Sequence, residues 1–142
     1  MPKLHCLTAA LLWASVACSS PNPGSAATGT FPADAYTTIA STSGALLVAV
    51  RTSPQPPSVG TNEVQLTITH ASDGTPVDGL TLAVEPWMPS MGHGTSTTTI
   101  TPEGDGVYLV TSVYLYMQGV WALRTTVSGP MSDDAAPQLV IQ

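Results

Sequence analysis

Short runs of alternating apolar and polar residues, interrupted repeatedly by proline or glycine, constrain the fold of this chain more than any other feature. The clearest run is residues 62–70 (NEVQLTITH), where Val64, Leu66 and Ile68 share one face and polar residues share the other. Proline cannot donate to a β-ladder and breaks helices, so the 13 prolines and 12 glycines argue against long helices. The pattern therefore predicts an all-β fold.

Seven such runs follow one another, separated by turn-forming clusters. They span residues 45–52, 62–70, 80–85, 96–101, 107–114, 120–127 and 137–141. Seven short strands in about 100 residues are typical of an antiparallel sandwich of immunoglobulin-like type. A domain of that size buries an adequate core without disulfides or metals. We therefore expect a seven-stranded immunoglobulin-like β-sandwich over residues 44–142.

The N-terminal region is predicted to be an export signal. Lys3 precedes a short apolar run over residues 7–17, which is too short to span a bilayer permanently. Residues 15–18 (SVAC) resemble the lipobox of bacterial lipoproteins, in which the cysteine, here Cys18, becomes the lipidated first residue. Ser15 departs from that pattern, because an aliphatic residue is usual there. The alternative is ordinary signal cleavage just before Cys18, with the cysteine incidental.

These features predict how the chain is organised and where it is located. We expect a lipoprotein-type signal peptide over residues 1–18, ending at the lipobox cysteine. A flexible linker rich in Ser, Ala, Pro and Gly is expected over residues 19–43, with a short strand near residues 36–39 as an alternative. The protein is then exported to the cell envelope and held by a lipid anchor, facing the periplasm or the cell exterior.

Cysteine and charge content exclude several classes of function. The other cysteine, Cys6, lies inside the signal, so lipidation of Cys18 leaves the folded domain without a thiol. That excludes a disulfide, a thiolate metal site and a thiol nucleophile. Only three Lys and Arg residues face nine acidic ones, which gives a net charge of −6 and no basic patch. Binding of nucleic acid is therefore not expected.

Groups suited to catalysis are also few. Ser90 lies near His93, but no strand–turn–helix elbow surrounds it and no acidic partner is apparent. Asp133 and Asp134 are adjacent in sequence, so in an extended strand they point to opposite faces and cannot flank one bond. We therefore expect that the protein is not an enzyme.

The segment over residues 85–94 (EPWMPSMGHG) carries the most distinctive chemistry. Thioether and imidazole groups suit copper, and Cu(I) above all, in a compartment where thiols oxidise. Met88, Met91 and His93 supply these groups, and the proline and glycines between and beside them allow the loop to curl. Together they predict a copper site, with the neutral imidazole of His93 as one ligand.

A fourth candidate ligand, Met117, comes from another part of the chain. In an antiparallel sandwich the chain reverses at each connection, so the connections after the third and fifth strands lie at the same end. The 86–94 loop follows the third predicted strand, and residues 115–119 follow the fifth. We therefore expect Met117 to lie at the same end as His93.

The chain resembles the YtkA-like domain family over about residues 45–141. The resemblance depends on four short segments, namely 74–77 (GTPV), 88–94 (MPSMGHG), 106–108 (GVY) and 117–121 (MQGVW). It implies a small immunoglobulin-like extracytoplasmic domain, of a kind sometimes found beside heavy-metal efflux components. Gln118 departs from the family pattern, because a proline often follows the methionine that corresponds to Met117.

Two functions remain open from the sequence. The first is a membrane-tethered module that holds copper through Met88, Met91, His93 and Met117 and either buffers it or passes it to a metal-efflux or metalloenzyme-assembly protein. The second is a structural or protein–protein interaction domain without metal, in which the methionines fill the core or form an apolar contact surface. On either interpretation Trp121 is expected in the core. Trp87 is expected to pack the loop against the domain, with shielding of a metal or stacking on a cation as the alternatives.

Overall fold

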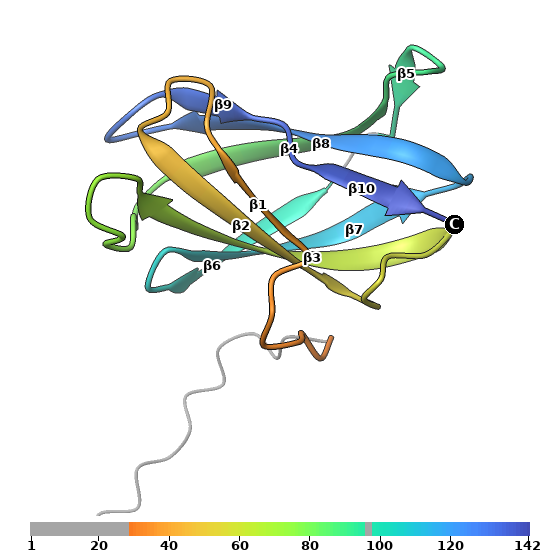
Figure 1. Ribbon diagram of the computed structural model, residues 1–142, viewed down its shortest axis with the longest axis horizontal. Coiled ribbons are helices and arrows are strands. Elements are labelled where there is room, and N and C mark those ends of the chain that lie inside the picture. The colour runs from red at the N-terminus through yellow and green to blue at the C-terminus, as the bar shows by residue number, and fades with distance from the viewer. Residues whose placement is uncertain (1–28, 96–97) are drawn as a thin grey trace, which may run out of the picture.

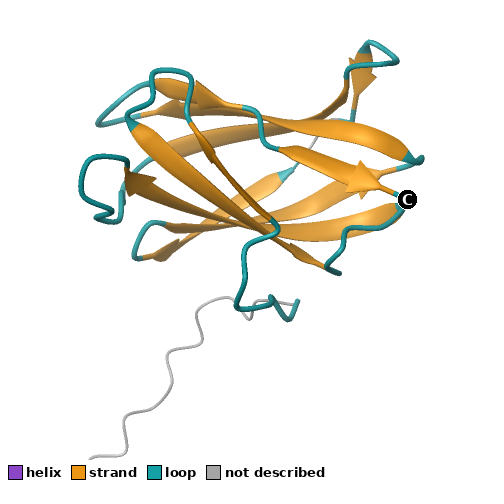
Figure 2. Cartoon of the chain, in the orientation of Figure 1, coloured by secondary structure: helices purple, strands orange, loops and turns teal. Residues whose placement is uncertain are grey.

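The computed structural model describes residues 29–95 and 98–142. In these ranges it contains ten strands and no helix, arranged as two antiparallel sheets that face each other (Figures 1 and 2). The described residues contain no helix of the length and hydrophobicity that crossing a membrane requires. The strands are β1 (Thr37–Ala40), β2 (Leu46–Ser53), β3 (Gly60–His70), β4 (Thr81–Met88), β5 (His93–Gly94), β6 (Thr99–Gly104), β7 (Val107–Leu115), β8 (Gly119–Ser128), β9 (Asp133–Ala135) and β10 (Gln138–Ile141).

Each sheet contains five strands. One has the order β1-β2-β3-β7-β6, and the other has the order β10-β8-β4-β5, with β9 paired to β8. Every pairing is antiparallel. The predicted all-β class is therefore confirmed, together with two antiparallel sheets that form a sandwich. The expected signal peptide and Cys18 lie outside the described residues.

The strand count differs from the expected seven, because the described residues also form β1, β5 and β9. These three strands have four, two and three residues, and β5 and β9 are too short for an alternating pattern to show in the sequence. β1 lies within the segment expected to be a linker, agrees with the short strand near residues 36–39 that was given as an alternative, and pairs with β2 at the edge of its sheet. Ordered structure therefore begins before residue 44.

Strand β4 is longer than expected, because it runs through Pro86 to Met88 instead of ending at Glu85. The carbonyl of Pro86 accepts a hydrogen bond from the Thr95 N–H at 2.9 Å, so the backbone groups of Pro86 face away from β8. A proline at such a position removes no hydrogen bond from the ladder between β4 and β8.

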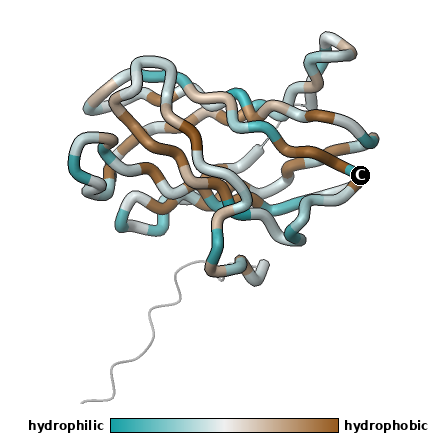
Figure 3. The backbone as a smooth tube through the Cα atoms, in the orientation of Figure 1, coloured by the Kyte–Doolittle hydropathy of each residue, from teal (hydrophilic) through white to brown (hydrophobic). Residues whose placement is uncertain are grey.

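The core lies between the two sheets and follows the alternation of the strands. In β3, Val64, Leu66 and Ile68 are fully buried, and Trp121 and Leu123 of β8 face them from the other sheet. Apolar segments accordingly follow the strands, and polar segments follow the connections (Figure 3). Trp121 is the largest of the fully buried side chains in the described residues, which confirms the expected core position.

One buried hydroxyl joins the sheets at the end of the sandwich where β4 begins. Tyr108 of β7 is 1% exposed. Its hydroxyl accepts a hydrogen bond from the Leu80 N–H at 3.1 Å and donates one to the Val77 carbonyl at 2.9 Å. These two bonds fix the segment that leads from β3 into β4, because both backbone groups are buried and need a partner.

The change Tyr108→Phe tests this link. Removing the hydroxyl leaves the Leu80 N–H and the Val77 carbonyl unpaired, so we expect the free energy of unfolding to fall by about 1–3 kcal/mol. Urea denaturation followed by tryptophan fluorescence measures it. The control is Tyr114→Phe, at a side chain that is 52% exposed, where we expect a change within about 0.5 kcal/mol. Equal losses in the free energy of unfolding of Tyr108→Phe and Tyr114→Phe would contradict the structural role of the Tyr108 hydroxyl.

Candidate functional site

A short hairpin projects from one end of the sandwich and carries three of the predicted ligands (Figure 1). Met88 of β4 pairs with His93 of β5, and the N–H groups of Met91 and Gly92 donate to the Met88 carbonyl at 3.1 and 3.0 Å. Gly92 has a φ of 67°, a left-handed conformation that glycine adopts without strain. We call residues 88–94, together with residues 116–117, the tip.

Gly94 allows β5 to approach β4 closely. A Cβ atom at this position would lie 2.4 Å from the Pro86 carbonyl oxygen, which is closer than any carbon–oxygen contact permits. Any other residue at position 94 would push the two strands apart. The two glycines that flank His93 therefore close the hairpin, and they leave the imidazole without packing from its immediate neighbours.

The four predicted ligands differ in exposure. Met91 is 55% exposed and His93 is also exposed, whereas Met117 is half-buried and packs against the core. Met88 is 2% exposed and belongs to the core, with its methyl group pointing towards Gly119, where an added Cβ would lie 3.0 Å away. The structure therefore presents Met91 and His93 at the surface, while Met88 closes the end of the core.

The two connections that carry the predicted ligands meet at the tip, as the alternation of chain direction predicts. The Tyr116 hydroxyl lies 2.5 Å from Nδ1 and 3.0 Å from Nε2 of His93. The two rings are stacked, with centroids 5.6 Å apart and planes 16° apart. An oxygen so close to both nitrogens of one ring is in line with neither of them, so the contact between the two side chains is one of ring packing. Tyr116 was not identified from the sequence.

An arginine lies on the flank of the tip. Trp87 is half-buried, and the Arg124 guanidinium lies 3.7 Å from the centroid of its ring. Glu85 holds the same guanidinium at 3.9 Å, with both side chains about half exposed, so this ion pair adds little stability. The Trp87 ring therefore acts as a cation–π partner for Arg124. Stacking on a cation was one alternative for Trp87 from the sequence, but Arg124 was not identified as the partner, because that depends on the register between β4 and β8.

Among the described residues, no three His, Cys, Asp or Glu side chains form a group that could hold a metal ion. The donors that the tip presents at the surface are instead one thioether and one imidazole. This donor set suits copper, and Cu(I) in particular, since soft sulfur and borderline nitrogen ligands are those that Cu(I) prefers.

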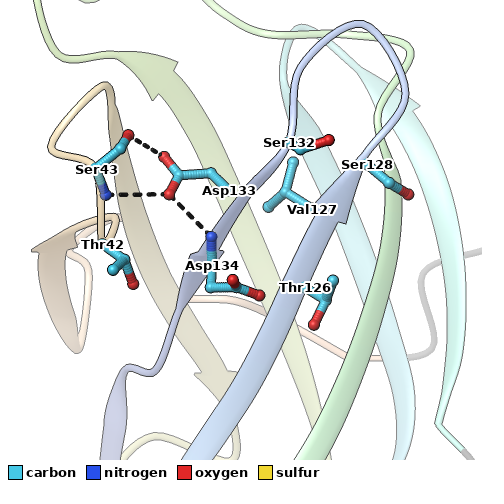
Figure 4. Close-up of a pocket in the computed structure, with 8 residues that line it drawn as sticks. All are labelled: Thr42, Ser43, Thr126, Val127, Ser128, Ser132, Asp133 and Asp134. Carbon is cyan, nitrogen blue, oxygen red and sulfur yellow. Dashed lines mark hydrogen bonds between the residues drawn. The ribbon is translucent and has the colours of Figure 1, made fainter.

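A polar hollow of about 440 Å³ lies at the opposite end of the sandwich, between the turn before β2 and strand β9 (Figure 4). The Asp133 carboxylate is at its centre and accepts hydrogen bonds from the Ser43 N–H at 3.1 Å, the Ser43 hydroxyl at 2.6 Å and the Asp134 N–H at 2.9 Å. Hydrogen bonds from the Ser41 hydroxyl, then from Ser43, lower the pKa of Asp133 to about 2. This carboxylate therefore joins the two sheets and is already saturated with donors.

Comparison with known proteins found one matching family. A family model described as YtkA-like matches residues 42–126, which is more than half of the chain. The match contains all four predicted ligands and ends before Asp133. No curated protein and no solved structure matches the chain.

The lowered pKa of Asp133 predicts an acid-sensitive contribution to stability. The carboxyl has a pKa of about 2 in the folded protein against 3.8 ordinarily, so the contribution is complete above about pH 4 and is lost as the pH falls towards 2. We expect Asp133→Asn to lower the free energy of unfolding by about 1–2 kcal/mol at pH 6. The difference from the unmodified protein should shrink below pH 4 in denaturant titrations. If the difference in free energy of unfolding between Asp133→Asn and the unmodified protein does not change with pH, the loss does not come from the Asp133 carboxylate.

Proposed function

This chain belongs to the YtkA-like family, and from that premise we propose that its tip binds copper, as Cu(I), at the outer side of a membrane. The observation that carries the proposal is the Met91 thioether, which is 55% exposed on the same tight turn as the exposed imidazole of His93. Methionine is ordinarily buried, and an exposed one beside a histidine offers two donors that suit a soft ion.

The proposed ligand set is narrower than the sequence predicted. Met91 and His93 are the primary ligands, and Met117 is the third, because it lies half-buried on the connection that carries Tyr116. Met88 has a structural role, since its side chain is part of the core directly below the turn. A site with three ligands or fewer leaves a coordination position open, which suits transfer of the ion to another protein.

The proposal includes the location of the protein. Residues 1–18 act as a lipoprotein signal, Cys18 carries the lipid, and the following residues tether an immunoglobulin-like domain to the cell envelope. The bound ion is then passed to a metal-efflux or metalloenzyme-assembly partner. The export pattern in the sequence supports this part of the proposal, together with the absence of cysteine from residues 19–142.

A second candidate function is protein binding by the same tip without metal. Two observations favour it: the His93 imidazole is already stacked on the Tyr116 ring, and the Met88 thioether lies in the core. On this hypothesis the exposed side chains of Met91 and Tyr114 form an apolar contact surface.

Cu(I) titration of the protein purified without residues 1–18, in competition with a chromophoric chelator, separates the two functions. We expect Met91→Ala/His93→Ala to weaken binding by at least about tenfold, which corresponds to 1.4 kcal/mol. Met88→Leu should bind normally, because its side chain is in the core. The matched control is Met131→Leu/His70→Ala, since both residues lie at the end of the sandwich opposite the tip. Equal, weak binding by the unmodified protein and the double alanine variant would favour the second function.

The change Cys18→Ser tests the anchor in cells. Without the thiol no lipid can be attached, so we expect the variant to leave the membrane pellet and to stop incorporating labelled fatty acid. The unmodified protein should remain in the pellet and be labelled. If both proteins fractionate alike and neither is labelled, the signal is simply cleaved and the domain is released.

A further inference from the structure

The exposed apolar side chains of the domain are gathered at the end that carries the tip. Among the described residues, six large apolar side chains are at least 36% exposed. Leu47 lies at the opposite end, where it pairs with Thr69. The register of β3 with β7 and of β8 with β10 places the other five at the tip, namely Val59, Met91, Tyr114, Val120 and Val140. Apolar side chains grouped on a surface in this way indicate a contact with another molecule or with a membrane.

The same end carries no charged side chain. It is formed by residues 54–61, 88–95, 114–121 and 139–141, which we call the apolar end and which contain no Asp, Glu, Lys or Arg. Acidic residues gather at the opposite end, on the connection after β3, on the turn between β6 and β7, and on β9. They are Asp73, Asp78, Glu103, Asp105, Asp133 and Asp134. The two ends of the sandwich therefore differ strongly in their affinity for water.

The apolar end continues from one sheet to the other. A hollow of about 400 Å³, lined in part by Pro56, Pro57 and Val140, lies between β10 and the connection from β2 to β3 that carries Val59. On the other side, the rings of Tyr114 and Tyr116 lie 6.5 Å apart. Tyrosine favours the layer between water and hydrocarbon, because its ring is apolar and its hydroxyl is polar.

The chain also enters the domain beside the apolar end. Gly29, the first described residue, lies against Ser53 and Glu63, because an added Cβ would be 2.7 Å from the Ser53 hydroxyl oxygen. The Arg51 guanidinium fixes this entry by donating to the Ala33 carbonyl at 3.0 and 3.1 Å. The ten residues 19–28 span at most about 36 Å. An anchor at Cys18 would therefore keep the apolar end close to the bilayer.

From these observations we infer that the apolar end is the surface with which the domain contacts the lipid bilayer that holds its anchor. The inference rests on the proposed location of the protein. Burial of the exposed apolar side chains in the interfacial layer favours this orientation, while the hydrated carboxylates of the opposite end remain in water. Anionic lipids repel those carboxylates and favour the same orientation. Met91 and His93 then lie in the headgroup layer, within reach of a metal-efflux protein in the same membrane.

Footprinting of the tethered protein tests the inference. Without residues 1–17 the chain has one thiol, Cys18, which can be coupled to a maleimide lipid in phosphatidylcholine vesicles. Hydroxyl radicals oxidise Met91 at the apolar end and Met131 at the opposite end, and mass spectrometry gives the ratio of the two within one molecule. We expect this ratio to fall by about tenfold relative to the free protein if contact is favoured about ten to one.

Two variants show which side chains produce the contact. Val59→Ser/Val140→Ser removes exposed apolar groups from the apolar end, so the ratio should return towards that of the free protein. Leu47→Ser is the matched control at the opposite end and should keep the ratio of the unmodified protein on vesicles. All three positions are at least 36% exposed, so urea denaturation should show both variants folded.

Three results would overturn the inference. The first is an unchanged ratio on vesicles, and the second is an equal response of the two variants; both leave the anchor proposal intact. The third is a ratio that falls in native membranes but not on vesicles, since a membrane protein then covers the apolar end instead of lipid. If the labelling experiment with Cys18→Ser shows no lipid on the unmodified protein, the proposed location itself fails, and the inference fails with it.

Discussion

The burial of Trp121 between the two sheets is the interaction that joins the scaffold to the tip. Its ring lies wholly in the core, and its Nε1–H binds the Met117 carbonyl on the connection above it. A buried indole N–H without an acceptor would be unfavourable by about 1–3 kcal/mol, so this connection cannot move away without loss of stability. Tyr116 packs edge-on against the same ring and contacts His93. Packing in the core therefore helps to determine where the exposed His93 ring lies.

Much of the scaffold was predictable from the sequence, because strands of eight residues or more show their alternation clearly. Strand β3 is the best example, with every second residue from Asn62 to Ile68 buried. The strands that were missed are β5 and β9, of two and three residues, whose formation depends on a neighbouring edge rather than on a pattern of their own. β5, for example, forms because Gly92 and Gly94 allow the chain to turn back against β4.

The candidate site was predictable only in part. The alternation of chain direction correctly placed residues 86–94 and 115–119 at one end of the sandwich. The exposure of each predicted ligand was not foreseen, because Pro86 was expected to end β4, whereas the buried series of Leu82 and Val84 continues through Pro86 to Met88. Tyr116 was missed because its partner lies 23 residues away in sequence, and only the folded arrangement of strands brings the two side chains together.

Met88 marks the boundary between the packed core and an exposed turn. The core ends at this side chain, and the turn that follows, residues 89–92, is exposed throughout. Insertions or substitutions in an exposed turn disturb few packed atoms, so they are tolerated far better than changes in the strands. Substitutions at Met91 on this turn therefore change the side chains that the tip presents at the surface, while Met88 and the sheets below retain one unchanged architecture.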